Sequence, residues 1–559
     1  MKFGLILTLI FLISTISFAF QKTGKTTKDV PFFPKTPKPE TELFYLNLLE
    51  KNNSLPEKFA LTVLQGLVNR DGGRIYITQP TDWHENNNLQ FWVDNLRKKG
   101  YNFTEINNPF ELFSTFKNNY KGAVIYEDNL FDNPLQTYKI NSLTLYCAIN
   151  DLVPLTPSLN SKLNIPVIFD TRGKYLTAKD AQDWVREEMW DKASKDVIAH
   201  TNPSHMTLKD YLVMHKIYPI WIGAGMTRDE ETQALKFIED INPNSPVMGC
   251  WGGYGEEPAG IMREPLLTRL CSNRGKFMLV TDGCQSLSIH AGLGYNKPKA
   301  EQVNSKRKIE LDESKTYICF SVTDGDNLQY LQIAFLNEQW WNNKERGNVP
   351  VNWGFSPLAY ELIPDMMEYF IETKTSLDGI TSEAGAGLIA PSIYGKDVYG
   401  NNVDILKNYF ELSAKSIEAS GFTSIRMADT SDIALTRDDC NKMALAMPNL
   451  SGILCDYGGP ALGLDRNSLT FFTENNIPVI RCSTFSPDGD RADNPTQKWI
   501  EKIKTFETTV KPGFMHIAVI NWYDSPESIK KVIDELGNDY VAVTAEELFD
   551  LVKQAQRKE

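Results

Sequence analysis

Short apolar segments recur along the chain from about residue 315 to its end, and nearly all of them run into polar or acidic residues. Apolar segments of this length are typical of buried strands, and the longer segments between them predict helices. Strands that alternate with helices and end in polar residues are typical of a (β/α)8 barrel. In that fold the reactive groups collect at the carboxyl ends of the strands. The expected strands are residues 317–322, 351–355, 379–381, 424–428, 452–455, 478–480, 514–520 and 540–543.

Helices are expected in the intervals that follow these strands. One of them has Pro526 in its first turn, where proline is well tolerated. Residues 395–404 make one connection long, and long loops on one face of a barrel usually shape a substrate cleft. The expected helices are residues 328–342, 358–373, 405–420, 437–447, 468–475, 496–509, 525–535 and 545–556.

The first half of the chain also alternates between helical and strand patterns. It predicts an open α/β region over residues 41–300, built as one or two small lobes. A charged, Lys-rich connection at 296–314 then separates this region from the barrel, which we expect over 315–559. The expected helices are residues 55–69, 89–98 and 226–240, and the expected strands are 74–77, 122–126, 166–169, 217–222 and 276–280.

The amino-terminal residues have the pattern of a secretory signal. Lys2 precedes an apolar stretch at 5–13, and Ser17-Phe18-Ala19 is a small-x-small cleavage site. We therefore expect residues 1–19 to be a signal peptide and the protein to be periplasmic or extracellular. Residues 20–40, rich in Lys, Thr and Pro, predict a flexible lead-in.

The composition of the chain limits the classes of molecule that it is expected to bind. The formal net charge of the 559-residue chain is -13, which makes nucleic acid and anionic membrane surfaces poor partners. A neutral polymer such as an oligo- or polysaccharide meets no such electrostatic conflict. The chain also contains 11 Trp and 22 Tyr, and such rings can stack on sugars. The eight Cys form no C-x-x-C pair and are expected mainly as buried free thiols.

Acidic residues at the predicted carboxyl ends are the main candidate chemistry. Hydrolysis of a glycosidic bond uses two carboxyl groups on either side of the bond, one as the acid and one as the base or nucleophile. Each acid alone could equally cap a helix or pair with a base, but six around one mouth favour a catalytic cleft. They are Asp324, Asp326, Glu383, Asp429, Asp456 and Asp524. We predict that Asp324, Glu383 and Asp456 supply the catalytic pair and one substrate ligand, and which of them is acid or base stays open.

Further residues at the same face are predicted to bind substrate. Glycines after Glu383 would let the backbone approach a ligand, aromatic rings could stack on sugar faces, and a buried arginine needs a carboxylate partner. Asn327 could instead cap the helix that follows it. The predicted binding residues are Asp326, Asn327, Gly385, Gly387, Arg426, Asp429, Tyr457, Arg481, Trp522 and Asp524.

Several other chemistries find no support in the sequence. The chain has six His but no H-E-x-x-H and no G-x-S-x-G, which disfavours a zinc hydrolase and a serine esterase, and it has no P-loop. No metal or cofactor is expected. Only His516 falls in the barrel, and its place early in a strand predicts that it lies away from the active face.

Residues 382–391, with the sequence SEAGAGLIAP, resemble the signature of the GxGYxYP family, whose members are assigned to the glycoside hydrolases. The segments 324–330 and 353–357 support the resemblance. The resemblance implies an N-terminal α/β region, a C-terminal barrel, secretion and a carbohydrate substrate. This chain departs from the signature, because Leu388 and Ala390 stand where tyrosines are expected.

Two alternatives stay open. A non-catalytic carbohydrate-binding protein on a decayed barrel would keep rings that stack on sugar but would lack opposed carboxyl groups. A metal-dependent deacetylase would use Asp324 and Asp326 as ligands, although paired histidines are absent from the sequence.

Overall fold

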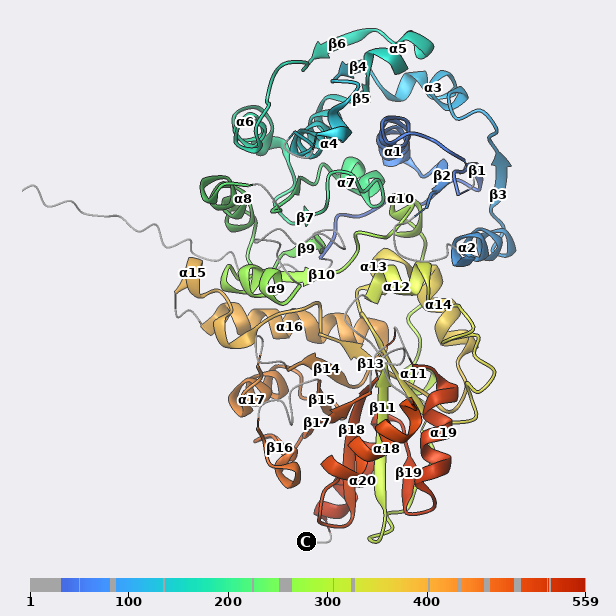
Figure 1. Cartoon of the computed structure of the whole chain (residues 1–559), viewed down its shortest axis with the longest axis vertical. Coiled ribbons are helices and arrows are strands. Elements are labelled where there is room, and N and C mark those ends of the chain that lie inside the picture. Colours follow the sequence, from blue (N-terminus) through green and yellow to red (C-terminus); the bar gives the residue numbers. More distant parts are fainter. Residues whose placement is uncertain are drawn as a thin grey trace, which may run out of the picture.

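The C-terminal half of the described chain is a closed barrel of seven parallel strands (lower part of Figure 1). The computed structural model describes residues 32–49, 51–80, 87–133, 136–223, 226–250, 264–304, 306–322, 327–400, 403–429, 434–456, 463–486, 494–519, 521 and 524–557. The strands follow one another around the ring in chain order, and the last of them returns to the first. They are β11 (Thr316–Val322), β12 (Val351–Phe355), β13 (Asp378–Glu383), β14 (Ile425–Ala428), β15 (Ile453–Asp456), β17 (Pro478–Phe485) and β18 (Gly513–Val519).

The eighth expected strand is present but does not complete the ring. β19 (Tyr540–Ala542) pairs only with the beginning of β11, at Thr316–Ile318. On the same side of β11, β12 pairs with its end, at Ser321 and Val322. β19 therefore enters between β11 and β12 at the amino end alone, and seven strands continue to the carboxyl end.

Helices other than α20 (Ala545–Gln556) cover the outside of the barrel, and three expected helices differ from the prediction. The helix expected at 328–342 ends at Ile333, the one expected at 358–373 is divided at Pro364, and residues 468–475 contain a strand instead. Pro364 lacks the N–H that a continuous helix needs. β16 (Thr470–Phe472) pairs antiparallel with β17, as its β-branched and aromatic residues favour. The barrel helices are α12 (Asn327–Ile333), α13 (Ala359–Leu362), α14 (Pro364–Thr373), α15 (Lys396–Tyr399), α16 (Val403–Ser420), α17 (Arg437–Ala446), α18 (Pro495–Phe506), α19 (Pro526–Leu536) and α20 (Ala545–Gln556).

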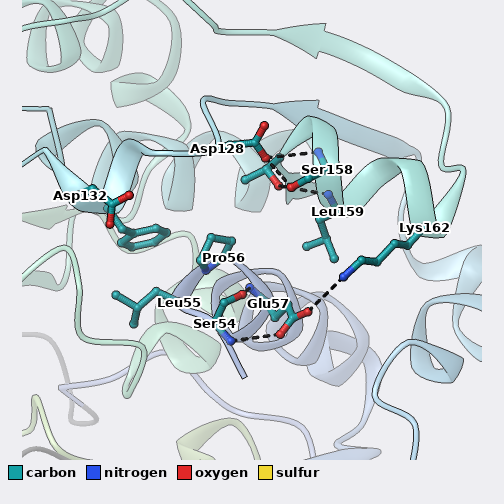
Figure 2. Close-up of a pocket in the computed structure, with 11 residues that line it drawn as sticks. Ser54, Leu55, Pro56, Glu57, Asp128, Asp132, Ser158, Leu159 and Lys162 are labelled. Carbon is teal, nitrogen blue, oxygen red and sulfur yellow. Dashed lines mark hydrogen bonds and ion pairs between the residues drawn. The ribbon is translucent and has the colours of Figure 1, made fainter. Parts of the chain in front are cut away.

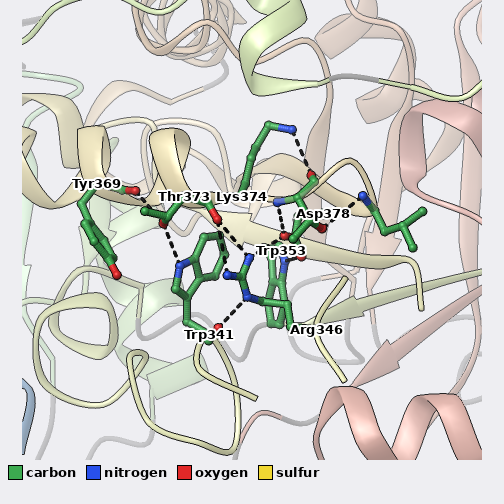
Figure 3. Close-up of polar contacts among 9 residues, drawn as sticks. Trp341, Arg346, Trp353, Tyr369, Thr373, Lys374 and Asp378 are labelled. Carbon is green, nitrogen blue, oxygen red and sulfur yellow. Dashed lines mark hydrogen bonds and ion pairs between the residues drawn. The ribbon is translucent and has the colours of Figure 1, made fainter. Parts of the chain in front are cut away.

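Arg346 anchors the segment between α12 and β12, the first part of which was expected to be helical (Figure 3). Its guanidinium donates a hydrogen bond of 2.6 Å to Asp378, at the start of β13, and lies 4.2 Å from the Trp341 ring centroid. Asp378 also accepts a 2.9 Å hydrogen bond from the indole N–H of Trp353 in β12. These contacts hold the chain between α12 and β12 against the barrel without a helix.

The C-terminal helix α20 contributes to the interior of the barrel. Phe549 and Leu548 of α20 belong to one buried cluster with Tyr317 of β11 and Leu454 of β15. β11 and β15 are not neighbours in the ring, so this cluster crosses the interior. The side chains of α20 therefore help to fill the barrel.

The N-terminal region contains three small parallel sheets in its described part, where one or two lobes were expected. Their orders are β2-β1-β3, β5-β4-β6 and β10-β9-β7-β8. The strands are β1 (Glu42–Asn47), β2 (Ile75–Thr78), β3 (Asn102–Glu105), β4 (Gly122–Ile125), β5 (Leu152–Leu155), β6 (Val167–Asp170), β7 (Ile198–His200), β8 (Pro219–Ile220), β9 (Pro246–Gly249) and β10 (Phe277–Leu279). The helices are α1 (Leu55–Val68), α2 (Asn87–Lys98), α3 (Glu111–Thr115), α4 (Tyr138–Asn150), α5 (Pro157–Leu163), α6 (Ala178–Trp184), α7 (Lys209–His215), α8 (Arg228–Asp240), α9 (Glu264–Asn273), α10 (Leu287–His290) and α11 (Ala300–Val303).

The flexible lead-in expected at 20–40 is wrong for its last part, while residues 1–31 lie outside the described ranges. Phe32 and Phe33 are buried, and the Phe32 ring lies 5.0 Å from that of Phe277 in β10. Thr36 is also buried and makes a 3.0 Å hydrogen bond with His215. Burial of two adjacent phenylalanine side chains is favourable enough to hold this segment against the protein, although the residues around them are polar.

The N-terminal region packs against the carboxyl ends of barrel strands. Met278 of β10 and Leu388, in the loop after β13, exchange backbone hydrogen bonds of 3.0 and 2.8 Å. Gln329 of α12, just beyond β11, accepts a 2.7 Å hydrogen bond from the Gly283 N–H. The face where a barrel of this type carries its reactive groups therefore lies at the junction of the two halves (Figure 1).

All eight cysteines lie in described ranges, where they are buried and free of disulfides. None of the described helices has the length and apolar character that crossing a bilayer requires.

Candidate active site

Two carboxylates and one guanidinium meet near the carboxyl ends of three adjacent strands. Glu383 ends β13, Arg426 lies in β14 and Asp456 ends β15. Arg426 donates a 2.9 Å hydrogen bond to Glu383 Oε2 through one terminal nitrogen and pairs with Asp456 Oδ2 through the other. The residues are 6%, 0% and 1% exposed, respectively. The sequence therefore correctly indicated that a buried Arg426 would pair with acids of the site, and the structure gives it two.

Strand register puts this group, which we call the Arg426 cluster, on the inner face of the barrel. Side chains of a strand alternate between its two faces. Leu454 belongs to the cluster that crosses the interior, so Asp456, two residues later in β15, also faces inward. Arg426 pairs in register with Leu454, and Glu383 pairs with Arg426. All three side chains of the Arg426 cluster share the inner face.

His516 of β18 lies beside this cluster, contrary to the expectation from the sequence. Its Nε2 lies 2.5 Å from Ser321 Oγ and 3.9 Å from Asp456 Oδ1. The stagger of strands in a barrel sets how far along the barrel axis each residue lies. Although the sequence places His516 early in its strand, it pairs in register with Cys319 in the middle of β11, two residues before Ser321. Sequence reasoning missed both His516 and Ser321, because the stagger is not visible in a single strand.

The imidazole of His516 is neutral at ordinary pH. Burial, with the nearby Arg426 charge, lowers the pKa of His516 to about 3. Ser321 and Asp456 both approach Nε2, whereas a Ser-His-Asp triad places its serine and its acid on opposite ring nitrogens. The arrangement therefore does not support a serine hydrolase mechanism.

Asp429 and Arg481 do not join the Arg426 cluster, although both were predicted to bind substrate. Arg481 pairs in register with Cys455, which faces outward because its neighbour Asp456 faces inward. Arg481 donates to Asp429 Oδ2 at 2.9 Å and to the Leu435 carbonyl at 2.6 Å. Burial raises the pKa of Asp429. This ion pair joins β17 to the segment that leads into α17, on the outer face of the sheet.

Comparisons with known proteins identify the family. Residues 44–118, 195–292 and 314–553 match, respectively, the models described as "GxGYxYP_N 1st domain", "GxGYxYP third domain" and "GxGYxYP putative glycoside hydrolase C-terminal domain". This chain belongs to the GxGYxYP family. A crystal structure described as a "putative hydrolase" from Bacteroides thetaiotaomicron VPI-5482 has 20% identity and a TM-score of 0.77. The similarity covers 94% of this chain and 97% of that chain, and it shows a common fold. No curated protein sequence matches the chain.

Membership of the GxGYxYP family fixes the function at a coarse level. The family model that covers the barrel describes a glycoside hydrolase, so the chain is assigned to the hydrolases. A carbohydrate substrate is implied by the same description.

The GxGYxYP signature segment is a docking loop in this chain, where Gly385 and Gly387 allow close packing, and binding of substrate by these two glycines stays a prediction. A Cβ on Gly387 would lie 2.5 Å from the Met278 carbonyl oxygen, and one on Gly385 would lie 3.0 Å from Ser413 Oγ. Gly385 also has φ +63, which other residues rarely adopt. The glycines let this loop pack closely against β10 and α16.

The two departures from the signature lie in this same docking loop. Leu388 is 8% exposed and belongs to the core of the N-terminal region, and Ala390 is 1% exposed. The Ala390 N–H donates a 2.8 Å hydrogen bond to Ser272. Both side chains are packed at the junction of barrel and N-terminal region, which ties the departures to packing between the two halves.

The remaining predicted residues are only partly described. Asp324, Asp326, Tyr457 and Trp522 lie outside the described ranges. Asn327 begins α12. Asp524 is 2% exposed beyond β18, and its backbone carbonyl accepts a 2.9 Å hydrogen bond from Gln339. Within the described ranges no three His, Cys, Asp or Glu side chains are grouped so as to hold a metal ion.

Proposed function

We propose that this chain is an exported glycoside hydrolase that cleaves an O-glycosyl bond at the carboxyl end of its barrel. Glu383 and Asp456 are proposed as catalytic carboxylates, with Asp324, outside the described ranges, as the third acid of the site. The observation that carries the proposal is the convergence of Glu383 and Asp456 on Arg426 inside the barrel. A closed barrel collects its reactive groups at this end.

The local chemistry supports a division of roles. A carboxylate beside a guanidinium is suited to act as a base or nucleophile, whereas the proton donor must carry its proton before the reaction. No described residue donates a hydrogen bond to Asp456 Oδ1, which is buried. That oxygen is therefore available to a sugar hydroxyl, to the attacking water or to the anomeric carbon. We assign the proton donor to Asp324, because Glu383 and Asp456 are both held by Arg426.

The junction of the two halves supports a buried reaction site. Helix α12, which follows β11, and the loop after β13 pack against residues 272–285 of the N-terminal region. Exclusion of water strengthens the electrostatic interactions of an active site and protects a reactive intermediate. We infer that the N-terminal region forms one wall of the substrate cleft.

Export is proposed from the N-terminal sequence alone. The basic residue, apolar stretch and small-x-small site of residues 1–19 support cleavage after Ala19. Mass spectrometry of protein recovered outside the cytoplasm should give a mature chain that begins at Phe20. A chain that retains Met1 would contradict the proposal.

A hydrolysis screen over soluble glycans tests the proposed site. We expect Glu383→Gln and Asp456→Asn each to lower kcat by at least about 10³-fold on any glycan that the wild type cleaves. Catalytic residues act as a unit, so the loss of one of them removes most of the rate enhancement. Asp324→Asn should lower kcat and remove the alkaline limb from the pH profile of kcat/KM, because that limb reports deprotonation of the proton donor.

Asp429→Asn is the matched control for this screen. It removes a buried carboxylate that is also paired with an arginine, but on the outer face of the same sheet. It should lower stability and leave kcat within about threefold of wild type for folded protein. Wild-type turnover that survives both Glu383→Gln and Asp456→Asn would refute the site assignment.

One observation favours a second candidate function, a carbohydrate-binding protein without activity. Arg426 contacts both inner carboxylates at once, as a purely structural ion cluster would. Glycan binding by the wild type without turnover at any pH would support this candidate over the hydrolase.

A further inference from the structure

We infer that a second cavity, at the carboxyl ends of β4 and β5, binds a neutral saccharide. The cavity has a volume of 390 Å³ and is lined by the first turn of α1, the residues after β4 and the start of α5 (Figure 2). We call it the α1–α5 cavity. Figure 1 shows β4, β5 and α5 at the end of the N-terminal region farthest from the barrel. The cavity is thus separate from the proposed active site.

The position of this cavity in its sheet is one that ligands commonly occupy. β4 and β5 are adjacent parallel strands, in register from Gly122 with Leu152 to Ile125 with Leu155. Asp128 and Asp132 follow β4, and Thr156 and Ser158 follow β5, and all four line the cavity. In open α/β sheets, ligands bind in the crevice beyond the carboxyl ends of the strands. The volume is also within the range of small-molecule sites, about 300–1,000 Å³.

The charges of the lining disfavour an anionic ligand. Glu57, Asp128 and Asp132 contribute three carboxylates against the single ammonium of Lys162. Glu57 accepts a 3.1 Å hydrogen bond from the Ser54 N–H, and Asp128 accepts one of 3.3 Å from the Ser158 N–H. Backbone donors that could have held a phosphate are therefore already used by carboxylates of the chain.

A bare cation is disfavoured as well. Within the described residues, these carboxylates do not form a group of three that could hold a metal ion. Lys162 lies 3.8 Å from Glu57 and supplies a positive charge of its own to the cavity. The charges of the cavity lining therefore favour a neutral ligand.

The surface chemistry of the α1–α5 cavity fits a ligand with many hydroxyl groups. Asp132 is exposed and its carboxylate forms no hydrogen bond or ion pair with a described residue, so the carboxylate can accept hydrogen bonds from hydroxyl groups. The Lys162 side chain is 60% exposed and can donate. Pro56 and Phe131 add apolar surface against which the C–H face of a sugar ring can lie. Carboxylate acceptors around an apolar surface are the combination that a saccharide needs.

This inference rests on the proposed function for its biological purpose, because a second site would hold a distant part of a polymeric substrate. Two linked sites raise apparent affinity for a polymer through effective concentration. The α1–α5 cavity should therefore improve KM for long glycans while leaving short substrates unaffected.

Titration calorimetry with maltohexaose, cellohexaose, xylohexaose and mannohexaose tests the cavity. The Asp456→Asn background is used so that no ligand is consumed. We expect at least one of the four to bind, and Asp132→Ala to weaken that binding roughly tenfold, as loss of a charged hydrogen-bond acceptor does. Asp132→Arg, which adds a cation and fills space, should abolish binding at the α1–α5 cavity and leave any binding at the barrel site unchanged. Asp229→Ala, at an exposed aspartate in the first turn of α8, is the matched control and should bind like the parent.

The outcomes separate this inference from the proposed function. Binding that depends on Asp132 in a protein without turnover would refute the hydrolase and retain the cavity. Turnover with binding unchanged in Asp132→Ala and Asp132→Arg would refute the cavity alone. Failure of all four hexasaccharides to bind would also overturn the inference.

Discussion

Arg426 determines the energetics of the proposed site at the scale of single residues. It is fully buried, and its two partners lie on the strands on either side of its own. A buried charge is tolerated only when its partners offset the loss of hydration. Removing Arg426 would leave Glu383 and Asp456 facing each other inside the barrel without a cation.

Arg426→Gln should therefore lower the free energy of unfolding by about 3–5 kcal/mol, measured by urea denaturation. Adding Glu383→Gln and Asp456→Asn should recover part of this loss, because the uncompensated charges are then absent. Arg481→Gln breaks the outer pair and serves as the control, and its cost should add to that of Glu383→Gln within about 0.5 kcal/mol. If the costs of Arg426→Gln and Glu383→Gln also added within about 0.5 kcal/mol, the expected coupling between Arg426 and Glu383 would be contradicted.

The site residues also show which details a single sequence carries. Glu383 and Asp456 are the last residues of strands that the alternating pattern of the barrel predicts, so their place at the carboxyl end could be predicted. The face of Arg481 and the height of His516 depend on register and stagger between strands, which no single strand contains. The sequence alone places Asp429 and Asp456 together, because both follow or end a strand. The alternation of side chains along the strands instead puts Asp456 on the inner face of the barrel and Asp429 on the outer face.

At the scale of elements, prediction succeeded for the repeating strand pattern of the barrel and failed for several short strands of the N-terminal region. The barrel strands were all anticipated, whereas β1, β3, β5, β7 and β9 were not. β3 is mostly exposed and polar, and β5 contains Pro154. β16 lies in a segment that was expected to be helical, and its antiparallel pairing with β17 is a tertiary contact that this segment alone does not reveal.

The contact between α20 and β15 gives a prediction for this scale. A Cβ on Gly452, at the entry to β15, would lie 2.2 Å from Phe549 Cδ1 of α20. Gly452→Ala should therefore destabilise the protein by about 1–3 kcal/mol through overpacking. Phe549→Ala alone should cost about 3–5 kcal/mol.

The double variant is the decisive measurement for this contact. Gly452→Ala combined with Phe549→Ala should be less destabilised in urea than the two single costs added together, because the clash is gone. Gly294→Ala is the control, since an added Cβ there meets no atom within 4 Å. Strict additivity would mean that α20 does not contact the beginning of β15.

At the scale of the whole molecule, buried histidines in separate parts of the fold set the response to acid. His200 of β7 is fully buried, and its Nδ1 lies 3.0 Å from the Cys250 carbonyl. His215 of α7 contacts Thr36, and His516 lies inside the barrel. Burial lowers the pKa of His200 and of His215 to about 4, and that of His516 to about 3.

These depressed pKa values predict acid destabilisation with a definite sign. The unfolded chain has histidine pKa values near 6.5, so it binds protons that the folded chain does not bind as the pH falls. Stability is fully present above about pH 6.5 and is lost down to about pH 3. Each histidine contributes a slope of about 1.4 kcal/mol per pH unit, so the three together contribute about 4 kcal/mol per pH unit near pH 5. Urea denaturation from pH 7 to pH 4.5 measures this slope, and His200→Gln should reduce it by about one third, whatever its cost at pH 7. A free energy of unfolding that stays level over that range would show that these histidines are already solvated in the folded protein.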